Sequence, residues 1–90
     1  MATAVVLINV RAEQTSSVAE ELAGIPGISE VYSVAGKHDL VAILRVGTNE
    51  ALADLVTDRI RGVAGIERTE TLIAFRAYSR HNIEALFDLD

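Results

Sequence analysis

A short pattern occurs twice in the chain and constrains its fold more than any other feature. Residues 22–28 are Leu-Ala-Gly-Ile-Pro-Gly-Ile, and residues 60–66 are Ile-Arg-Gly-Val-Ala-Gly-Ile. Each copy ends an amphipathic stretch and begins a stretch typical of a strand. At the same offset, the apolar run at 5–10 corresponds to residues 43–48. Two copies of strand, helix and strand in 90 residues predict a duplicated α+β fold.

Hydrophobic spacing predicts the elements of the first half. Residues 5–10 are rich in β-branched side chains and predict a strand. The helix that follows has an apolar stripe formed by Val18, Leu22 and Ile25. Ser17 with Glu20 fits a capping box at its start, and Gly24 is placed to end it. Residues 28–35 predict a second strand.

The second half repeats this order. A turn at 36–39 leads into a nearly all-apolar strand at 40–46, after which Thr48 can cap a second helix. The buried stripe of that helix consists of Leu52, Leu55, Val56 and Ile60. Residues 67–78 then predict a long strand. One of its faces carries Glu67, Thr69, Thr71, Ile73 and Phe75, and the other carries Arg68, Glu70, Leu72, Ala74 and Arg76.

The order β-α-β-β-α-β predicts a ferredoxin-like sandwich, in which a four-stranded antiparallel sheet carries two helices on one face. In that topology the first and third strands are central, and these are the strands with apolar residues on both faces. We expect this domain to cover residues 1–79. Residues 80–90 form a short amphipathic tail, with apolar positions at Ile83, Leu86 and Phe87, that we expect to dock on a neighbouring subunit rather than to act as a ligand lid.

The face of the sheet without helices should also be apolar. Its residues would run from Val5 or Val6 through Leu40 or Val41 to Ile73, a patch too large for a soluble monomer. Burying about eight such side chains would give a gross gain of about 12 kcal/mol before association costs. The sequence therefore predicts a dimer packed sheet to sheet. Regulatory domains of the ACT type share the strand order but pair edge to edge, which two-faced central strands do not favour.

Composition excludes several classes of site. The chain has no Cys and no Trp, which removes disulfides and zinc or iron–sulfur ligation by Cys. Its formal net charge is −5 and its basic residues are scattered, so direct nucleic-acid binding is not expected. No apolar run reaches the length of a membrane span, and the N-terminus lacks the basic region of a signal peptide. We expect a cytoplasmic protein without a cofactor or a metal.

The turn holds the first candidate for chemistry, the adjacent pair His38 and Asp39. Such a pair could serve as acid and base or as metal ligands. Neighbouring residues on an extended chain point apart, however, so a turn in which Asp39 bonds backbone N–H groups and anchors a ligand is favoured. Nucleophilic catalysis and phosphate binding have no supporting motif. The third strand also lacks the aromatic residues of an RNA-binding sheet.

Thr69 and Thr71 are the second candidate. They share one face of the last predicted strand, where two hydroxyls could bind the carboxylate or amine of a small polar ligand. The alternative is that threonine simply suits an edge strand.

Two segments resemble a known family. The first is Val34-x-Gly36-x-x-Asp39 in the turn before the third strand. The second is Val63-x-Gly65-Ile66 followed by Thr69-x-Thr71. Together with the repeated Gly-x-x-Gly joints, these segments resemble the effector domain of Lrp/AsnC regulators, also called the RAM domain (regulation of amino acid metabolism). The resemblance covers essentially the whole chain.

The resemblance implies a sheet-to-sheet dimer, often assembled into a ring of dimers, with an amino-acid site between subunits. Carried over to this chain, the effector-binding residues are Val34, Gly36, His38, Asp39, Thr69 and Thr71. Gly36 would let the backbone approach the ligand, and Asp39 would hold the turn or meet the ligand's ammonium.

Full-length regulators place a helix-turn-helix domain before the first strand, whereas Met1 here stands almost at that strand. The resemblance therefore implies a module that senses an amino acid, does not bind DNA alone and acts through a full-length relative. Two other functions are open. One is a ligand-independent oligomeric scaffold. The other is a dimeric α+β barrel enzyme of the monooxygenase type, for which Asn9 and Tyr32 are the obvious candidate residues.

Overall fold

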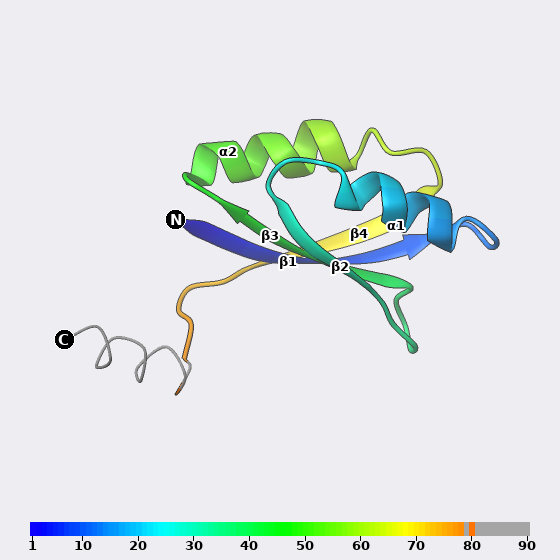
Figure 1. Cartoon of the computed structure of the whole chain (residues 1–90), viewed down its shortest axis with the longest axis horizontal. Coiled ribbons are helices and arrows are strands. Elements are labelled where there is room, and N and C mark those ends of the chain that lie inside the picture. The colour runs from blue at the N-terminus through cyan, green and yellow to red at the C-terminus, as the bar shows by residue number, and fades with distance from the viewer. Residues whose placement is uncertain (79, 81–90) are drawn as a thin grey trace.

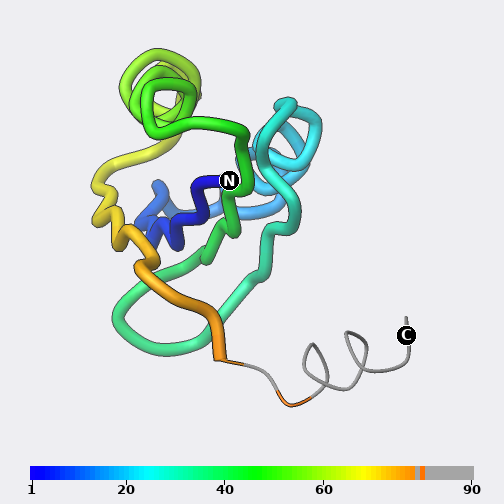
Figure 2. Tube along the Cα trace, turned by 90° about the vertical axis from the view of Figure 1, so that its left-hand side faces the viewer, coloured from blue at the N-terminus to red at the C-terminus, as the bar shows by residue number. Residues whose placement is uncertain are grey.

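The structure, a computed structural model that describes residues 1–78 and 80, has the predicted order of elements. The elements are β1 (Ala2–Val10), α1 (Thr15–Ala23), β2 (Ile28–Ser33), β3 (Leu40–Val46), α2 (Asn49–Asp54), the π-helical turn η1 (Leu55–Ile60) and β4 (Ile66–Ile73). The strands form one antiparallel sheet in the order β2-β3-β1-β4. Both helices lie on one side of it (Figures 1 and 2). The ferredoxin-like fold is thus confirmed, with the first and third strands central.

Strict alternation along β1 and β3 builds the core beneath the helices. Every second residue of β1 is buried, and these residues are Ala2, Ala4, Val6, Ile8 and Val10. On β3 the matching residues are Leu40, Ala42 and Leu44. The helical segments contribute Val18, Leu22, Leu52, Leu55 and Ile60, as their apolar spacing predicts. The core is therefore the layer between one face of the sheet and the two helices.

The opposite face of the sheet carries a second apolar row. Val5 pairs with Ile43 and Leu7 pairs with Val41, and all four side chains are only half-buried. On the neighbouring strand Leu72 pairs with Val5 and is 46% exposed. We call the face formed by Val5, Leu7, Val41, Ile43 and Leu72 the open face.

The register of β4 corrects one prediction. Ile73 pairs with the core residue Ala4, so it lies on the helix side of the sheet rather than on the open face, and it is 60% exposed there. Leu72 takes its place on the open face. The other choices that the sequence left open are settled in the same way, because Val6 and Leu40 are core residues.

Two strands end earlier than their sequence pattern predicts. β2 ends at Ser33 because the chain turns into a loop that the Val34 N–H closes by donating to the Asp39 carbonyl. β4 ends at Ile73, which pairs with Ala4, and the last bond between the two strands runs from the Ala74 N–H to the Thr3 carbonyl. In this register residues 77 and 78 would lie beyond Met1 and would have no neighbour on β1 to pair with. The apolar tail positions at 83, 86 and 87 lie outside the described residues.

The helix ends follow the sequence only in part. Thr48 caps α2 as predicted, since its hydroxyl accepts the Ala51 N–H at 3.0 Å. The predicted capping box at the start of α1 is wrong, because Ser17 lies inside the helix and donates to the Gln14 carbonyl. After Asp54 the helix continues as the π-helical turn η1, and the spacing of the apolar residues does not predict this change. Among the described residues, no helix is long and apolar enough to cross a membrane.

The repeated pattern corresponds to a repeated turn. Gly24 is the residue on which α1 ends, as expected, and its backbone keeps a negative φ of −85°. The second glycines of the two copies, Gly27 and Gly65, instead have φ of 98° and 100°. That conformation is unfavourable for residues with a Cβ. Each copy therefore turns the chain from a helix into the next strand with the same backbone geometry.

Candidate functional site

The β2–β3 loop, residues 34–39, is attached to the end of β1. It projects from the sheet on the side away from the helices (Figures 1 and 2). Its base is closed by the bond between Val34 and Asp39, and the Asp39 N–H donates to the Ile8 carbonyl at 2.9 Å. The backbone of the loop is thereby joined to a central strand of the sheet.

The Asp39 side chain makes a second attachment. The pairing of β1 with β4 shifts register between Asn9 and Val10, so that Val10 pairs with Ile66. At this irregularity Oδ2 of Asp39 accepts the Val10 N–H at 2.9 Å. The carboxylate thus satisfies a partly buried backbone donor. This is the backbone-shaping role that the turn motif favours for Asp39.

Asn9 makes the third attachment from the open side of β1. Its Nδ2 donates to the Lys37 carbonyl at 2.8 Å, and its Oδ1 lies 3.0 Å from Nδ1 of His38. Because Nδ2 is the donor to a carbonyl, Oδ1 is the acceptor and the proton of the imidazole is assigned to Nδ1. One asparagine therefore holds both the loop backbone and the His38 ring.

These attachments place the loop beside β4 and leave a cavity of about 300 Å³ between them. We call it the loop–β4 pocket, and its lining residues are Asn9, His38, Arg68, Thr69 and Glu70. A second cavity of similar volume adjoins it along Asn9, Glu67 and Arg68. The volume lies at the lower end of the range for ligand pockets, roughly 300–1,000 Å³, and suits a small ligand.

The structure brings together only some of the residues that the sequence singles out. His38 and Thr69 line the loop–β4 pocket, and Asp39 supports the loop from β1. Val34 and Gly36 are exposed on the loop, where Gly36 has a φ of 129°. Thr71 pairs with the core residue Val6 and does not line the pocket.

Three lining residues were not predicted as effector contacts. From the sequence alone, Asn9 is a candidate only for the enzyme alternative, although it is a polar residue in an apolar strand. Arg68 and Glu70 occupy alternate positions that pair with Asn9 and Leu7 on β1, which brings them to the open side of the sheet. A polar residue on a central strand opposite a charged residue on an edge strand is the signal that could have found them.

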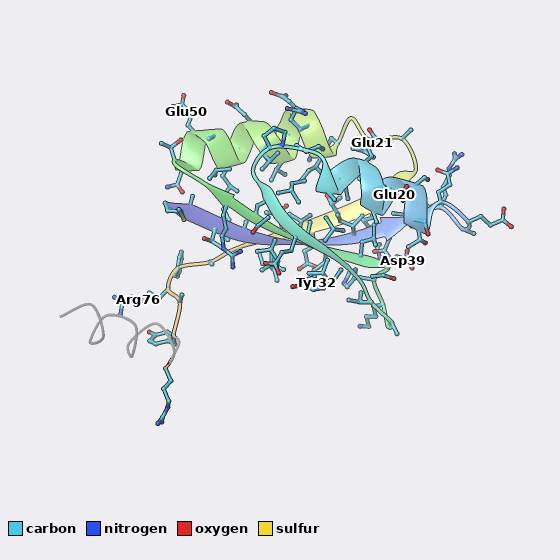
Figure 3. All side chains as sticks on the ribbon, in the orientation of Figure 1. Glu20, Glu21, Tyr32, Asp39, Glu50 and Arg76 are labelled. Carbon is cyan, nitrogen blue, oxygen red and sulfur yellow. The ribbon has the colours of Figure 1, made fainter. Side chains whose placement is uncertain are left out.

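The charged residues that line the loop–β4 pocket form no ion pair in the described part of the chain, whereas charged residues elsewhere on the sheet do. The one ion pair among the described residues joins Arg45 to Glu30 at 3.2 Å, and the Tyr32 hydroxyl also donates to Glu30. These two contacts, that of Tyr32 foremost, hold the pKa of Glu30 below its usual value, and the Glu30 carboxylate raises the pKa of Tyr32. Figure 3 shows Tyr32 on the side of the sheet away from the helices.

The arrangement offers few means for catalysis or metal binding. Asn9 and Tyr32 bond different partners, Asn9 in the loop and Tyr32 on its own strand. The residues that the structure describes contain no group of three His, Cys, Asp or Glu side chains placed to hold a metal ion. The chemistry that the loop–β4 pocket does offer is hydrogen bonding and charge.

Replacing Asp39 by alanine tests the attachment of the loop. The change leaves the Val10 N–H without its acceptor, and we expect it to lower the free energy of unfolding by about 2 kcal/mol. For a domain of this size that is roughly 8–16 °C in Tm. Thermal unfolding followed by circular dichroism measures it. Asp39→Asn keeps an acceptor oxygen and should lose less than half as much. Equal losses in the two variants would contradict the assigned bond.

The chain is similar in sequence and in fold to known proteins. Residues 3–83 match the family described as the Lrp/AsnC ligand binding domain. The crystal structure of TTHA0845 from Thermus thermophilus is 50% identical, with a TM-score of 0.83 over 89% of this chain and 100% of that one. The regulator FL11 of Pyrococcus horikoshii, described as HTH-type, is 36% identical over 75 residues, or 83% of this chain.

A third relative was solved with a ligand. The feast or famine regulatory protein Rv3291c from M. tuberculosis, complexed with L-methionine, is 33% identical, with a TM-score of 0.73 over 89% of this chain and 54% of that one. The curated relatives are longer than the part that matches, since the alignment with FL11 spans 49% of that protein. The comparisons therefore concern one domain of those regulators.

Proposed function

Because the chain belongs to the family of Lrp/AsnC ligand-binding domains, we propose that it is an amino-acid-sensing regulatory module. The family is one of binding domains and not of enzymes, which leaves the monooxygenase-type alternative without support. The proposal concerns what the module binds, how it assembles and how it acts.

We place the effector site in the loop–β4 pocket and its surroundings. The observation that carries this is the threefold attachment of the β2–β3 loop to β1, which holds His38 across a small cavity from Arg68 and Glu70. A loop fixed in advance loses little conformational freedom when a ligand binds. The methionine complex of the M. tuberculosis relative supports an amino acid as the ligand class. In our proposal Thr69 lies at this site, and Val34 and Gly36 contact the effector from a second subunit. Thr71, on the helix side of the edge strand β4, contacts it only from a subunit packed against that edge.

We further propose that the open face is a homodimer interface. Val5, Leu7, Val41 and Ile43 form a contiguous apolar row that the helices do not cover. Pairing this face with its copy would remove the row from water and bring the loop–β4 pocket to the edge of the interface. Assembly of such dimers into a ring remains an expectation from the family resemblance.

The regulatory output is proposed to pass through a relative with a DNA-binding domain. The curated relatives are described as HTH-type transcriptional regulators and are matched over less than half of their length. A net charge of −5 does not favour direct binding to DNA. Shared subunit interfaces would let the module enter a mixed oligomer with such a regulator in the cytoplasm.

A thermal-shift panel tests the sensing function. Each standard amino acid is added at millimolar concentration, and one or a few are expected to raise Tm. A ligand at a hundred times its Kd adds about 2.7 kcal/mol, or roughly 10 °C or more for a small domain. The increase should be strongly reduced in Asp39→Ala, which frees the loop from the Val10 N–H, and retained in Glu50→Gln, which changes an exposed residue of α2. A flat response to the whole panel would contradict the proposal and favour the ligand-independent scaffold.

A further inference from the structure

We propose that Arg68 and Glu70 select the zwitterionic form of the effector, Arg68 binding its α-carboxylate and Glu70 its α-ammonium. The inference rests on the proposed function and goes further, because it names the two groups that decide which derivatives of an amino acid are accepted. Neither residue belongs to the motifs by which the sequence resembles its family.

The spacing of the two side chains fits such a ligand. They occupy alternate positions of β4 and pair with Asn9 and Leu7, so both point to the open side of the sheet. The Cα atoms of alternate residues in a strand are about 6.8 Å apart, and their side chains leave the sheet in the same direction. A carboxylate and an ammonium on one carbon, each at about 2.9 Å from its counter-charge, span a comparable distance. One small molecule can therefore contact both.

The charges of Arg68 and Glu70 are also available. In the part of the chain that the structure describes, neither forms an ion pair, in contrast to Arg45 and Glu30 on the same face of the sheet. Both nevertheless line the cavity. A ligand that carries one positive and one negative group can compensate both charges without rearrangement of the protein.

Two of the remaining lining groups, the Asn9 amide and Nδ1 of His38, are already engaged within the protein. The Asn9 amide is engaged at both ends, with the Lys37 carbonyl and with the His38 ring. Nδ1 of His38 is taken by this contact, which leaves Nε2 as the free nitrogen of the ring. A singly charged ligand would meet one opposite charge and one like charge across the pocket. The zwitterion is therefore favoured over an amide, an ester or an N-acyl derivative.

The test compares three forms of one amino acid by isothermal titration calorimetry. L-Methionine, or whichever standard amino acid gives the largest thermal shift, is titrated as the free acid, as the α-amide and as the N-acetyl derivative. In the unmodified protein the amide and the N-acetyl form should each bind about tenfold more weakly or worse, because each loses one charge-assisted contact.

Single variants then assign each contact. Arg68→Gln should weaken binding of the free acid by about tenfold and nearly abolish its advantage over the amide, while its advantage over the N-acetyl form remains. Glu70→Gln should do the reverse. Merely structural roles for these residues would lower the affinity for all three forms alike. Arg76→Gln and Glu21→Gln remove a charge of each sign at exposed positions away from the pocket and should change nothing.

The outcomes separate the two proposals. Equal affinities for the three forms in the unmodified protein, or unchanged selectivity in both variants, would overturn the zwitterion inference and leave the sensing function intact. A loss of dimer in Arg68→Gln and Glu70→Gln with selectivity preserved would also overturn it, since the charges would then serve a contact between subunits. Absence of binding by every free amino acid to the unmodified protein would refute the proposed function itself.

Discussion

Replacing Gly27 or Gly65 by alanine is expected to lower the free energy of unfolding by about 3 kcal/mol in each case. Both glycines have φ near 100°, and an L-residue held there costs about 1–3 kcal/mol. An added Cβ would also collide with packed side chains. At Gly27 it would lie 2.9 Å from both Val46 Cγ1 and Leu55 Cδ2, and overpacking of this kind costs about 1–3 kcal/mol.

The same holds for the second copy of the turn. At Gly65 the added Cβ would lie 2.9 Å from Val18 Cγ2, and the Val18 side chain is 1% exposed and has no room to move. Urea unfolding measures the loss as a shift in midpoint at constant slope. Gly47→Ala is the matched control, because its Cβ would have no neighbour within 4 Å and its backbone is not left-handed. A loss at Gly47 as large as those at Gly27 and Gly65 would contradict the explanation.

Replacing Val41 by aspartate is expected to raise the Kd of the proposed dimer by about a hundredfold or more. Val41 lies on the open face between Leu7 and Tyr32, so pairing two copies of this face would bury two unpaired carboxylates per dimer. The desolvation of such groups amounts to several kcal/mol, and each 1.4 kcal/mol is a factor of ten in Kd. The monomer should stay folded, because this position is partly exposed in the single chain.

Sedimentation equilibrium across micromolar concentrations measures this change. Arg61→Asp adds the same carboxylate at an exposed position after η1, on the helix side of the sheet, and should leave the Kd unchanged. A variant at Val41 that still dimerises like the unmodified protein would place the interface elsewhere. A chain that is already monomeric and well folded at these concentrations would exclude the sheet-to-sheet dimer.

The fold could be predicted from the sequence because its patterns are local. The apolar runs of β1 and β3 identify the two central strands, and the repeated glycine pattern gives the same helix-to-strand turn twice. The predictions are wrong where the pairing between strands determines the end of an element or the face on which a residue lies. β4 stops at Ile73, opposite Ala4, although β1 extends to Ala2, and no property of residues 74–78 indicates that limit.

Of the candidate site, the sequence predicts the residues of the β2–β3 loop but not Arg68 and Glu70 on β4. The Gly-x-x-Asp turn marks a constrained loop, but the atom that Asp39 binds, the Val10 N–H, becomes its neighbour only through the pairing of β1 with β3. Nothing in the sequence alone singles out Arg68 and Glu70, because charged side chains are common on edge strands, where they are usually solvated. Only the pairing of β4 with Asn9 and Leu7 brings them beside the loop.

The sheet order also matters while the protein is being made. β1 is synthesised first, yet one of its two partners, β4, is the last strand along the chain. At about 5–20 residues per second, the ribosome needs roughly 1–5 s to extend the chain from the end of β3 to the end of β4. Throughout that interval the apolar strand β1 presents an unpaired backbone edge to other nascent chains. Aggregation during expression should therefore depend on how fast the last strand is translated, and slow codons between residues 47 and 73 should increase it.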